Sequence, residues 1–189
     1  MAKSFHNLVG LPGFSEQLIR NHIALYEGYV ANTVKVADAL KKLLAEGKTA
    51  TPEYAELSRR LGWEWNGMRL HELYFGNLGA KPMNAKSRLL TKIAEDFGTF
   101  DNWEKAFRAT GAMRGIGWVI LYYDPLDKKL FNAWINEHDV GHMAGAIPLL
   151  VMDVFEHAFM IDYGLKRADY IEAFFKQINW EEVEFRFRP

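Results

Sequence analysis

The sequence of 189 residues contains no cysteine. This absence excludes disulfide bonds, thiolate metal sites, iron–sulfur clusters and a cysteine nucleophile, and it leaves histidine and carboxylate as the strong metal ligands. An excess of one charge is also missing, since 23 basic and 24 acidic residues are interspersed and give a formal net charge of −1. Because there is no block of like charge, we do not expect a nucleic acid as a partner.

The chain also lacks a long hydrophobic run. Its apolar stretches fall well short of the ~20 residues that a membrane-spanning helix needs, and the N-terminal segment MAKSFHNLVGLPGFSEQ has no long apolar core. We therefore expect a cytoplasmic protein without a membrane partner. With 49% hydrophobic and 14% aromatic residues, the composition is typical of a globular protein with one domain or two small packed units.

The first part of the chain predicts a hairpin of two long helices. Ser15 is a candidate N-cap for the first helix, which extends towards residue 44. Side chains recur along it at helical spacing, at Leu18, His22, Leu25 and Tyr29. After Gly47, Thr51 and Pro52 begin a second helix. The side chains that share one face of this helix are Leu61, Trp65, Met68, His71 and Phe75.

The second part of the chain predicts a mixed α/β unit. The Gly, Pro and Asn residues of segment 76–87 indicate a boundary, after which we expect helices at 87–97 and 101–110. The runs GWVILYYD and KKLFNAWI predict a β-hairpin with a Pro turn, residues 147–154 predict a third strand, and a final helix from about Glu156 or Lys166 runs to Trp180. The predicted fold is α+β: an N-terminal long α-helical hairpin, domain 1–80, packed on a C-terminal α/β domain, 84–189, with a three-stranded antiparallel sheet.

Ionisable residues stand where burial is expected. The strand-like segment IPLLVMDVFEHAF ends in Asp153, Glu156 and His157, and a carboxylate buried without a partner is too costly unless it is protonated or binds a cation. His22 and His71 lie on the apolar helix faces, where a single His is most often a core residue bonded to a carbonyl. Together with Asp153 and His157, however, they supply three imidazoles and one carboxylate, a set that suits iron, manganese or zinc.

These residues also carry a resemblance. DVFEHAF is similar to the D-x-W-E-H-A-[YF] signature of the iron/manganese superoxide dismutases. GIGWVIL resembles the first strand of that family, RLHELYFGNL its second metal-binding helix, and MIDYGLKRADYIEAFFKQINW its C-terminal helix. The resemblance covers the chain from about residue 14 to residue 180, in the expected order.

The resemblance implies an enzyme that converts superoxide to oxygen and hydrogen peroxide, as a homodimer or tetramer with one iron or manganese ion per subunit. The implied metal ligands are His22, His71, Asp153 and His157. Tyr29 matches the pocket tyrosine that helps to gate substrate and relay protons. His138 matches the Gln or His that bonds metal-bound solvent, and Trp118 matches the aromatic wall.

The chain departs from the family pattern at several positions. His22 and Tyr29 are seven residues apart where eight are usual, so an ungapped alignment would place Asn21 at the ligand position. A one-residue deletion or the loss of a helix bulge explains this spacing. Phe155 replaces the usual Trp, and Met160 replaces a Tyr that usually meets a His of the other subunit.

Several alternatives stay open at this stage. Glu156 either reaches across the dimer axis to the ligand His of the neighbouring subunit or is a solvated helix residue, and His142 is an alternative to His138. Competing functions are a non-catalytic homologue of the same fold and a zinc hydrolase. Having His138 rather than Gln, together with Val151 two residues before Asp153, favours iron or dual metal use.

Overall fold

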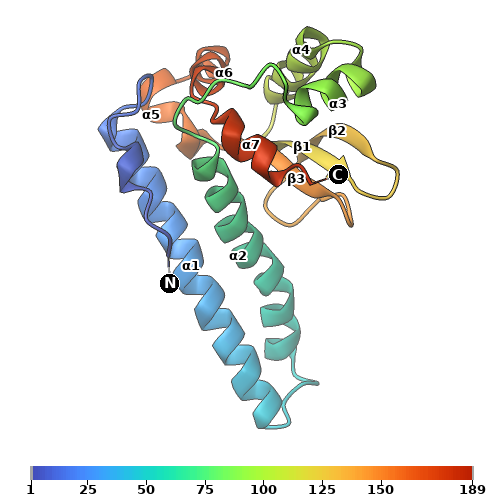
Figure 1. Ribbon diagram of the computed structural model, residues 1–189. Coiled ribbons are helices and arrows are strands. Elements are labelled where there is room, and N and C mark those ends of the chain that lie inside the picture. The colour runs from blue at the N-terminus through green and yellow to red at the C-terminus, as the bar shows by residue number, and fades with distance from the viewer. Residues whose placement is uncertain (1, 189) are drawn as a thin grey trace.

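The computed structural model describes residues 2–188. Two long helices form a hairpin that projects from a C-terminal half built of a small sheet and shorter helices (Figure 1). The elements in chain order are η1 (His6–Leu8), α1 (Glu16–Ala45), α2 (Pro52–Gly76), α3 (Arg88–Phe97), α4 (Phe100–Gly111), β1 (Trp118–Asp124), β2 (Lys129–Ile135), β3 (Ile147–Asp153), η2 (Glu156–Ala158), α5 (Met160–Tyr163), α6 (Arg167–Lys176) and α7 (Trp180–Arg186). The predicted α+β fold with a helical hairpin and an antiparallel sheet is confirmed.

The hairpin helices begin at the predicted caps. The side chain of Ser15 accepts a hydrogen bond from the amide of Leu18, and the side chain of Thr51 accepts one from the amide of Tyr54. Each bond satisfies an amide at the start of a helix that has no partner inside the helix. α1 continues unbroken as an α-helix from Glu16 to Ala45.

The apolar faces of the hairpin differ in detail from the prediction. Leu25 is 36% exposed and Trp65 is 46% exposed, so neither belongs to the core. On α1, Leu18 and His22 of the predicted stripe are buried, and Ile19, Ile23 and Tyr26, each one position further along, are buried as well. Two adjacent stripes of a helix differ by only about 100°, so the tertiary partners can cover parts of both.

The sheet has the order β2-β1-β3, with both pairings antiparallel. Trp118, the first residue of β1, lies opposite Ile135 at the end of β2 and opposite Asp153 at the end of β3. One end of the sheet therefore brings Trp118, Asp153 and the segment after β2 together. The residue before Trp118 has to be glycine, because Gly117 has φ 133° and an added Cβ would lie 2.0 Å from the carbonyl oxygen of Ile135.

The C-terminal helix differs from the prediction. The chain passes through the short elements η2 and α5, turns at Gly164, and forms α6 from Arg167 to Lys176 with Lys166 as N-cap, so the predicted start at Lys166 is observed and the start at Glu156 is not. α7 then begins at Trp180, where the sequence predicts the end of one continuous helix. The helix is interrupted because the carbonyls of Gln177 and Ile178 accept hydrogen bonds from the backbone of residues 79–81. Within residues 2–188, no helix is both long enough and apolar enough to span a membrane.

Candidate metal centre

Four side chains from four elements converge at the end of the sheet. His22 comes from α1, His71 from α2, Asp153 from the end of β3, and His157 from η2. The Nε2 atoms of His22, His157 and His71 lie 3.2, 3.1 and 3.7 Å from the same oxygen, Oδ2 of Asp153. One ligand atom from each residue lies within 4.8 Å of all the others. Donor atoms that share an ion at about 2 Å each are roughly 3 to 4 Å apart, so these positions fit a single metal ion.

The regular geometry of α1 explains the spacing of seven residues. Seven residues complete nearly two turns of an α-helix, so His22 and Tyr29 face the same side of α1 without a bulge. His22 is 1% exposed, whereas Asn21 is exposed to solvent. This geometry favours His22 over Asn21 as the ligand, and the continuous helix agrees with the loss of a bulge.

The hydrogen bond that His71 makes outside the centre leaves a lone pair aimed at the centre. Nδ1 of His71 lies 2.6 Å from the carbonyl oxygen of Gly67, and since a carbonyl can only accept, Nδ1 carries the proton. Nε2 of His71 is then a bare lone pair, buried beside a carboxylate oxygen. Among the described residues, Nε2 of His71 and Nδ1 of His22 have no hydrogen-bond partner. An acceptor facing an acceptor in a buried site is stabilised by a cation between them, and iron or manganese fits this donor set.

The electrostatics of the centre favour metal-binding protonation states. Burial lowers the pKa of His22 and lowers that of His71 well below its ordinary value, so both rings are neutral. Burial acts to raise the pKa of Asp153, but the adjacent imidazoles of His157 and His22 outweigh this effect and hold the pKa below its usual range. A neutral imidazole and an ionised carboxylate are the forms that bind a metal ion.

Asp153 is also fixed by hydrogen bonds outside the centre. Its Oδ1 atom accepts from the amide of Phe155 at 2.8 Å, and its main-chain carbonyl accepts from the hydroxyl of Tyr170 at 2.6 Å. These bonds leave Oδ2 free for the centre. The sequence analysis did not identify Tyr170, because its separation of 17 residues from Asp153 carries no local signal.

Tyr29 and His138 form a hydrogen-bonded pair beside the centre. The hydroxyl oxygen of Tyr29 lies 2.7 Å from Nε2 of His138, and the Tyr29 ring stacks on His71 at a centroid distance of 5.3 Å. The indole N–H of Trp118 donates to Nδ1 of His138 at 3.1 Å. Burial lowers the pKa of His138 to about 4, so the ring is neutral. Because Nδ1 accepts from Trp118, Nε2 carries the proton and donates it to Tyr29.

Phe155 and Glu156, in the segment after Asp153, differ in exposure: Phe155 is partly buried and Glu156 is exposed. The ring of Phe155 stacks on His157 at 5.3 Å and lies 4.9 Å from His138, so it walls the centre as expected of an aromatic residue. Glu156 is exposed on this single chain, and His157 keeps 30% of its side chain exposed. The centre is thus fully buried at His22, His71 and Asp153 and partly exposed at His157.

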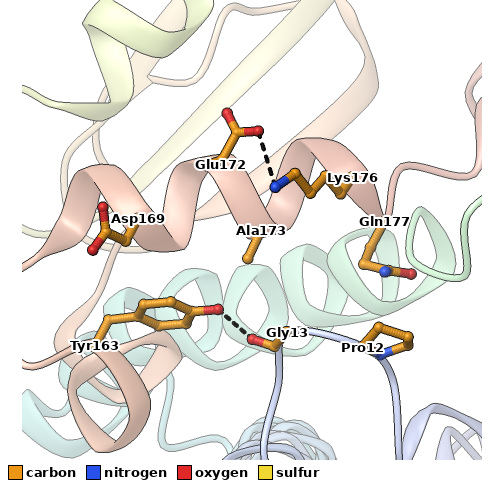
Figure 2. Close-up of a pocket in the computed structure, with 8 residues that line it drawn as sticks. All are labelled: Pro12, Gly13, Tyr163, Asp169, Glu172, Ala173, Lys176 and Gln177. Carbon is orange, nitrogen blue, oxygen red and sulfur yellow. Dashed lines mark hydrogen bonds and ion pairs between the residues drawn. The ribbon is translucent and has the colours of Figure 1, made fainter.

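A surface hollow of about 450 Å³ lies elsewhere, between the N-terminal loop and α6 (Figure 2). Two pairs of its polar groups bond each other: the hydroxyl of Tyr163 donates to the carbonyl of Gly13, and Glu172 pairs with Lys176 at 3.4 Å. None of the four candidate ligands lines this hollow among the residues that the structure describes. The convergent chemistry lies at the buried centre and not in this hollow.

Comparison with known proteins agrees with this geometry. Residues 85–186 match the family described as iron/manganese superoxide dismutases, C-terminal domain. The chain belongs to the iron/manganese superoxide dismutase family. It is 38% identical over 182 residues to the superoxide dismutase [Fe] of Cupriavidus metallidurans, an alignment that covers 94% of this chain and 90% of the relative.

Relatives named for either metal are found at similar identity. The superoxide dismutase [Fe] of Aquifex pyrophilus is 39% identical over 94% of this chain and 85% of its own length. The superoxide dismutase [Mn] of Haloarcula marismortui is 34% identical over 91% of this chain and 84% of its own length. The family assignment made from the signature segments is confirmed.

The sequence analysis did not identify Gly67 as part of the site. An added Cβ at Gly67 would lie 2.5 Å from Cδ1 of Tyr29, so the absence of a side chain makes room for that ring. Gly67 precedes His71 by four residues, which puts its carbonyl within reach of the His71 ring. A glycine inside a helix, one turn before a candidate ligand, was the available signal.

Proposed function

We infer that this protein is a superoxide dismutase that converts superoxide to oxygen and hydrogen peroxide with one iron or manganese ion per subunit. The convergence of three imidazole nitrogens on one buried carboxylate oxygen carries this conclusion. Family membership supports it, because the curated relatives that cover most of the chain are named superoxide dismutases. When bound, such an ion would supply the redox chemistry, in which one superoxide loses an electron and another gains one.

In this proposal His22, His71, Asp153 and His157 hold the ion. The low pKa of Asp153 and of the two helix histidines means that no proton has to be displaced from them near neutral pH. The bond from His71 to the carbonyl of Gly67 fixes the tautomer that presents Nε2 to the ion.

Tyr29 and His138 would act on protons, because peroxide formation consumes two of them. Burial raises the pKa of Tyr29 to about 12, so its hydroxyl stays protonated at neutral pH. The oxygen of Tyr29 accepts from Nε2–H of His138, which leaves its own O–H free to donate to another group. The predicted bond from His138 to metal-bound solvent would compete with Tyr29 for the single N–H of the neutral ring. Trp118 fixes the tautomer of His138.

Metal analysis combined with activity tests this function. The protein is expressed with iron or with manganese, and the metal content and superoxide turnover of each form are measured. We expect about one ion per chain and activity in at least the iron form, in line with a preference for iron or dual use. Absence of both metals from the purified protein would contradict the function and favour a non-catalytic homologue. Hydrolysis by a zinc form without redox activity would favour a hydrolase.

We also propose that the protein is a homodimer in which Glu156 links each metal centre to the other subunit. Glu156 is exposed on the single chain, and apolar side chains lie on the same face, with Met113 48% exposed and Met160 41% exposed. Light scattering during gel filtration distinguishes a monomer, a dimer and a tetramer. Glu156→Ala is expected to weaken the dimer, and a monomeric wild-type protein would refute the proposal.

Two further points remain proposals. The division into domains 1–80 and 84–189 is supported by the match of the C-terminal domain to residues 85–186. Separate expression of the two pieces, followed by circular dichroism, would test it. The expected cytoplasmic location can be tested by cell fractionation.

A further inference from the structure

The segment that presents His138 is held by a second histidine. After β2 the chain makes a tight turn in which Asn136 bridges Val140 and Glu137 has a left-handed φ of 58°. His142 then folds back over the turn. Its Nε2 atom lies 2.7 Å from the main-chain oxygen of His138, and its Nδ1 atom lies 2.7 Å from the hydroxyl oxygen of Tyr122.

The direction of both hydrogen bonds follows from the chemistry of the partners. A carbonyl can only accept, so Nε2 of His142 carries a proton and donates it to His138. In the neutral ring Nδ1 is then an acceptor, and it receives the hydroxyl proton of Tyr122. Burial raises the pKa of Tyr122 to about 12, so this hydroxyl is a donor at neutral pH. His142 therefore has both ring nitrogens satisfied in a single neutral tautomer.

The central strand attaches this turn at two points. Trp118 and Tyr122 are four residues apart on β1 and share one face of the strand. Trp118 donates to the ring of His138, while Tyr122 donates to His142, which in turn holds the main chain of His138. One attachment fixes the orientation of the ring and the other fixes the backbone that carries it.

We propose that His142 is a positioning residue for the metal centre. It holds the main chain of His138 in place, and this keeps the His138 ring within hydrogen-bond distance of the Tyr29 hydroxyl. The 2.7 Å bond between His138 and Tyr29 tolerates only a few tenths of an ångström of movement. Tyr29 stacks on His71, so a displacement of the turn reaches the surroundings of the metal. This proposal rests on the proposed function, and it assigns His142 a role distinct from that of His138.

The experiment compares four variants in the full-length protein. His142→Leu removes both hydrogen bonds, Tyr122→Phe removes only the hydroxyl donor, and His142→Gln keeps an amide that can donate to the carbonyl of His138. The matched control is Tyr123→Phe, since Tyr123 is also buried on β1 but points to the opposite face and packs on Phe187.

The first readout is the midpoint potential of the iron-loaded protein at equal metal content. We expect His142→Leu and Tyr122→Phe to change the equilibrium between the two oxidation states by about tenfold, which is ~59 mV for one electron. His142→Gln and Tyr123→Phe should both keep the wild-type potential. A wild-type potential in His142→Leu, an equal shift in Tyr123→Phe, or an equal shift in His142→Gln would each overturn the proposal.

The second readout does not depend on metal or on activity. Hydrogen exchange of the Trp118 indole N–H, followed by NMR in the metal-free protein, reports whether His138 keeps its place. We expect at least about tenfold faster exchange in His142→Leu and in Tyr122→Phe, and wild-type exchange in Tyr123→Phe. Unchanged exchange in Tyr122→Phe, the mildest of the variants, would refute the positioning role even if His142→Leu does not fold. Wild-type protein without metal or activity would instead refute the proposed function.

Discussion

Gly67→Ala tests how closely the helical hairpin is fitted around Tyr29. The added Cβ would lie 2.5, 2.7 and 2.9 Å from Cδ1, Cε1 and Cγ of the Tyr29 ring, where ordinary contacts begin at 3.4 Å. The ring would have to move by roughly 1 Å to restore normal contact. Such a movement would break the 2.7 Å bond between Tyr29 and His138. The substitution therefore combines a steric clash with the loss of a hydrogen bond.

The expected effect on stability follows from three contributions. Overpacking costs about 1 to 3 kcal/mol, and losing the hydrogen bond costs about 1 kcal/mol more. Replacing Gly by Ala inside a helix stabilises the folded protein by about 1 kcal/mol, which offsets part of this cost. We expect Gly67→Ala to lower the free energy of unfolding by about 1 to 3 kcal/mol, and the melting temperature by a few degrees to about 10 °C.

The same helix offers a matched control. Gly62 also lies within α2, but an added Cβ there would meet nothing within 4 Å. Gly62→Ala should therefore raise the free energy of unfolding by up to about 1 kcal/mol. Denaturant unfolding of both variants, together with metal content and turnover, forms the assay. Equal stability of the two variants would refute the argument, as would normal turnover in Gly67→Ala.

Three further predictions concern the residues of the centre. His157→Ala should abolish metal retention, measured by elemental analysis, and normal occupancy would refute its assignment as a ligand. Tyr29→Phe should keep the metal but alter turnover or product inhibition, so unchanged steady-state kinetics would contradict its role with protons. His138 binds its proton at a pKa of about 4 in the folded protein and about 6.5 in the unfolded chain, so the unfolded chain binds more protons between these values. The metal-free protein should therefore lose up to about 3 kcal/mol of stability as the pH falls from 6.5 to 4, and His138→Gln should lack this loss when unfolding is measured across that range.

Much of the fold was predictable because its signals are local. The caps at Ser15 and Thr51 are set by side chains three residues from the amides that they bond. The strands follow from β-branched and aromatic runs between turn residues. The prediction of a helix that reaches Trp180 was wrong. Residues 177–179 pair with segment 77–81, which is far away in the chain, so no local pattern shows where the helix ends.

The candidate site was likewise predictable where its signals are local. His22 could be chosen over Asn21 from the helical pattern, because a regular α-helix places residues seven apart on one face. The choice between His138 and His142 depended on a loop whose path is set by β1, and sequence spacing carries no information about that path. The hydrogen bond from Tyr122 to His142 could not be predicted either, because an alternating strand pattern does not show which buried hydroxyl has an acceptor nearby.

The four candidate ligands belong to α1, α2, β3 and η2, so the centre joins the N-terminal hairpin to the sheet. In the metal-free protein, the Nε2 lone pair of His71 faces the carboxylate of Asp153 across 3.7 Å without a hydrogen-bond partner among the described residues. A cation turns this repulsion into attraction, and it stabilises the folded chain in proportion to its affinity because it binds the assembled centre and not the separate segments. Metal binding and the packing of the two halves are therefore coupled, and a substitution that loosens the hairpin against the sheet weakens metal binding even when all four ligands are intact.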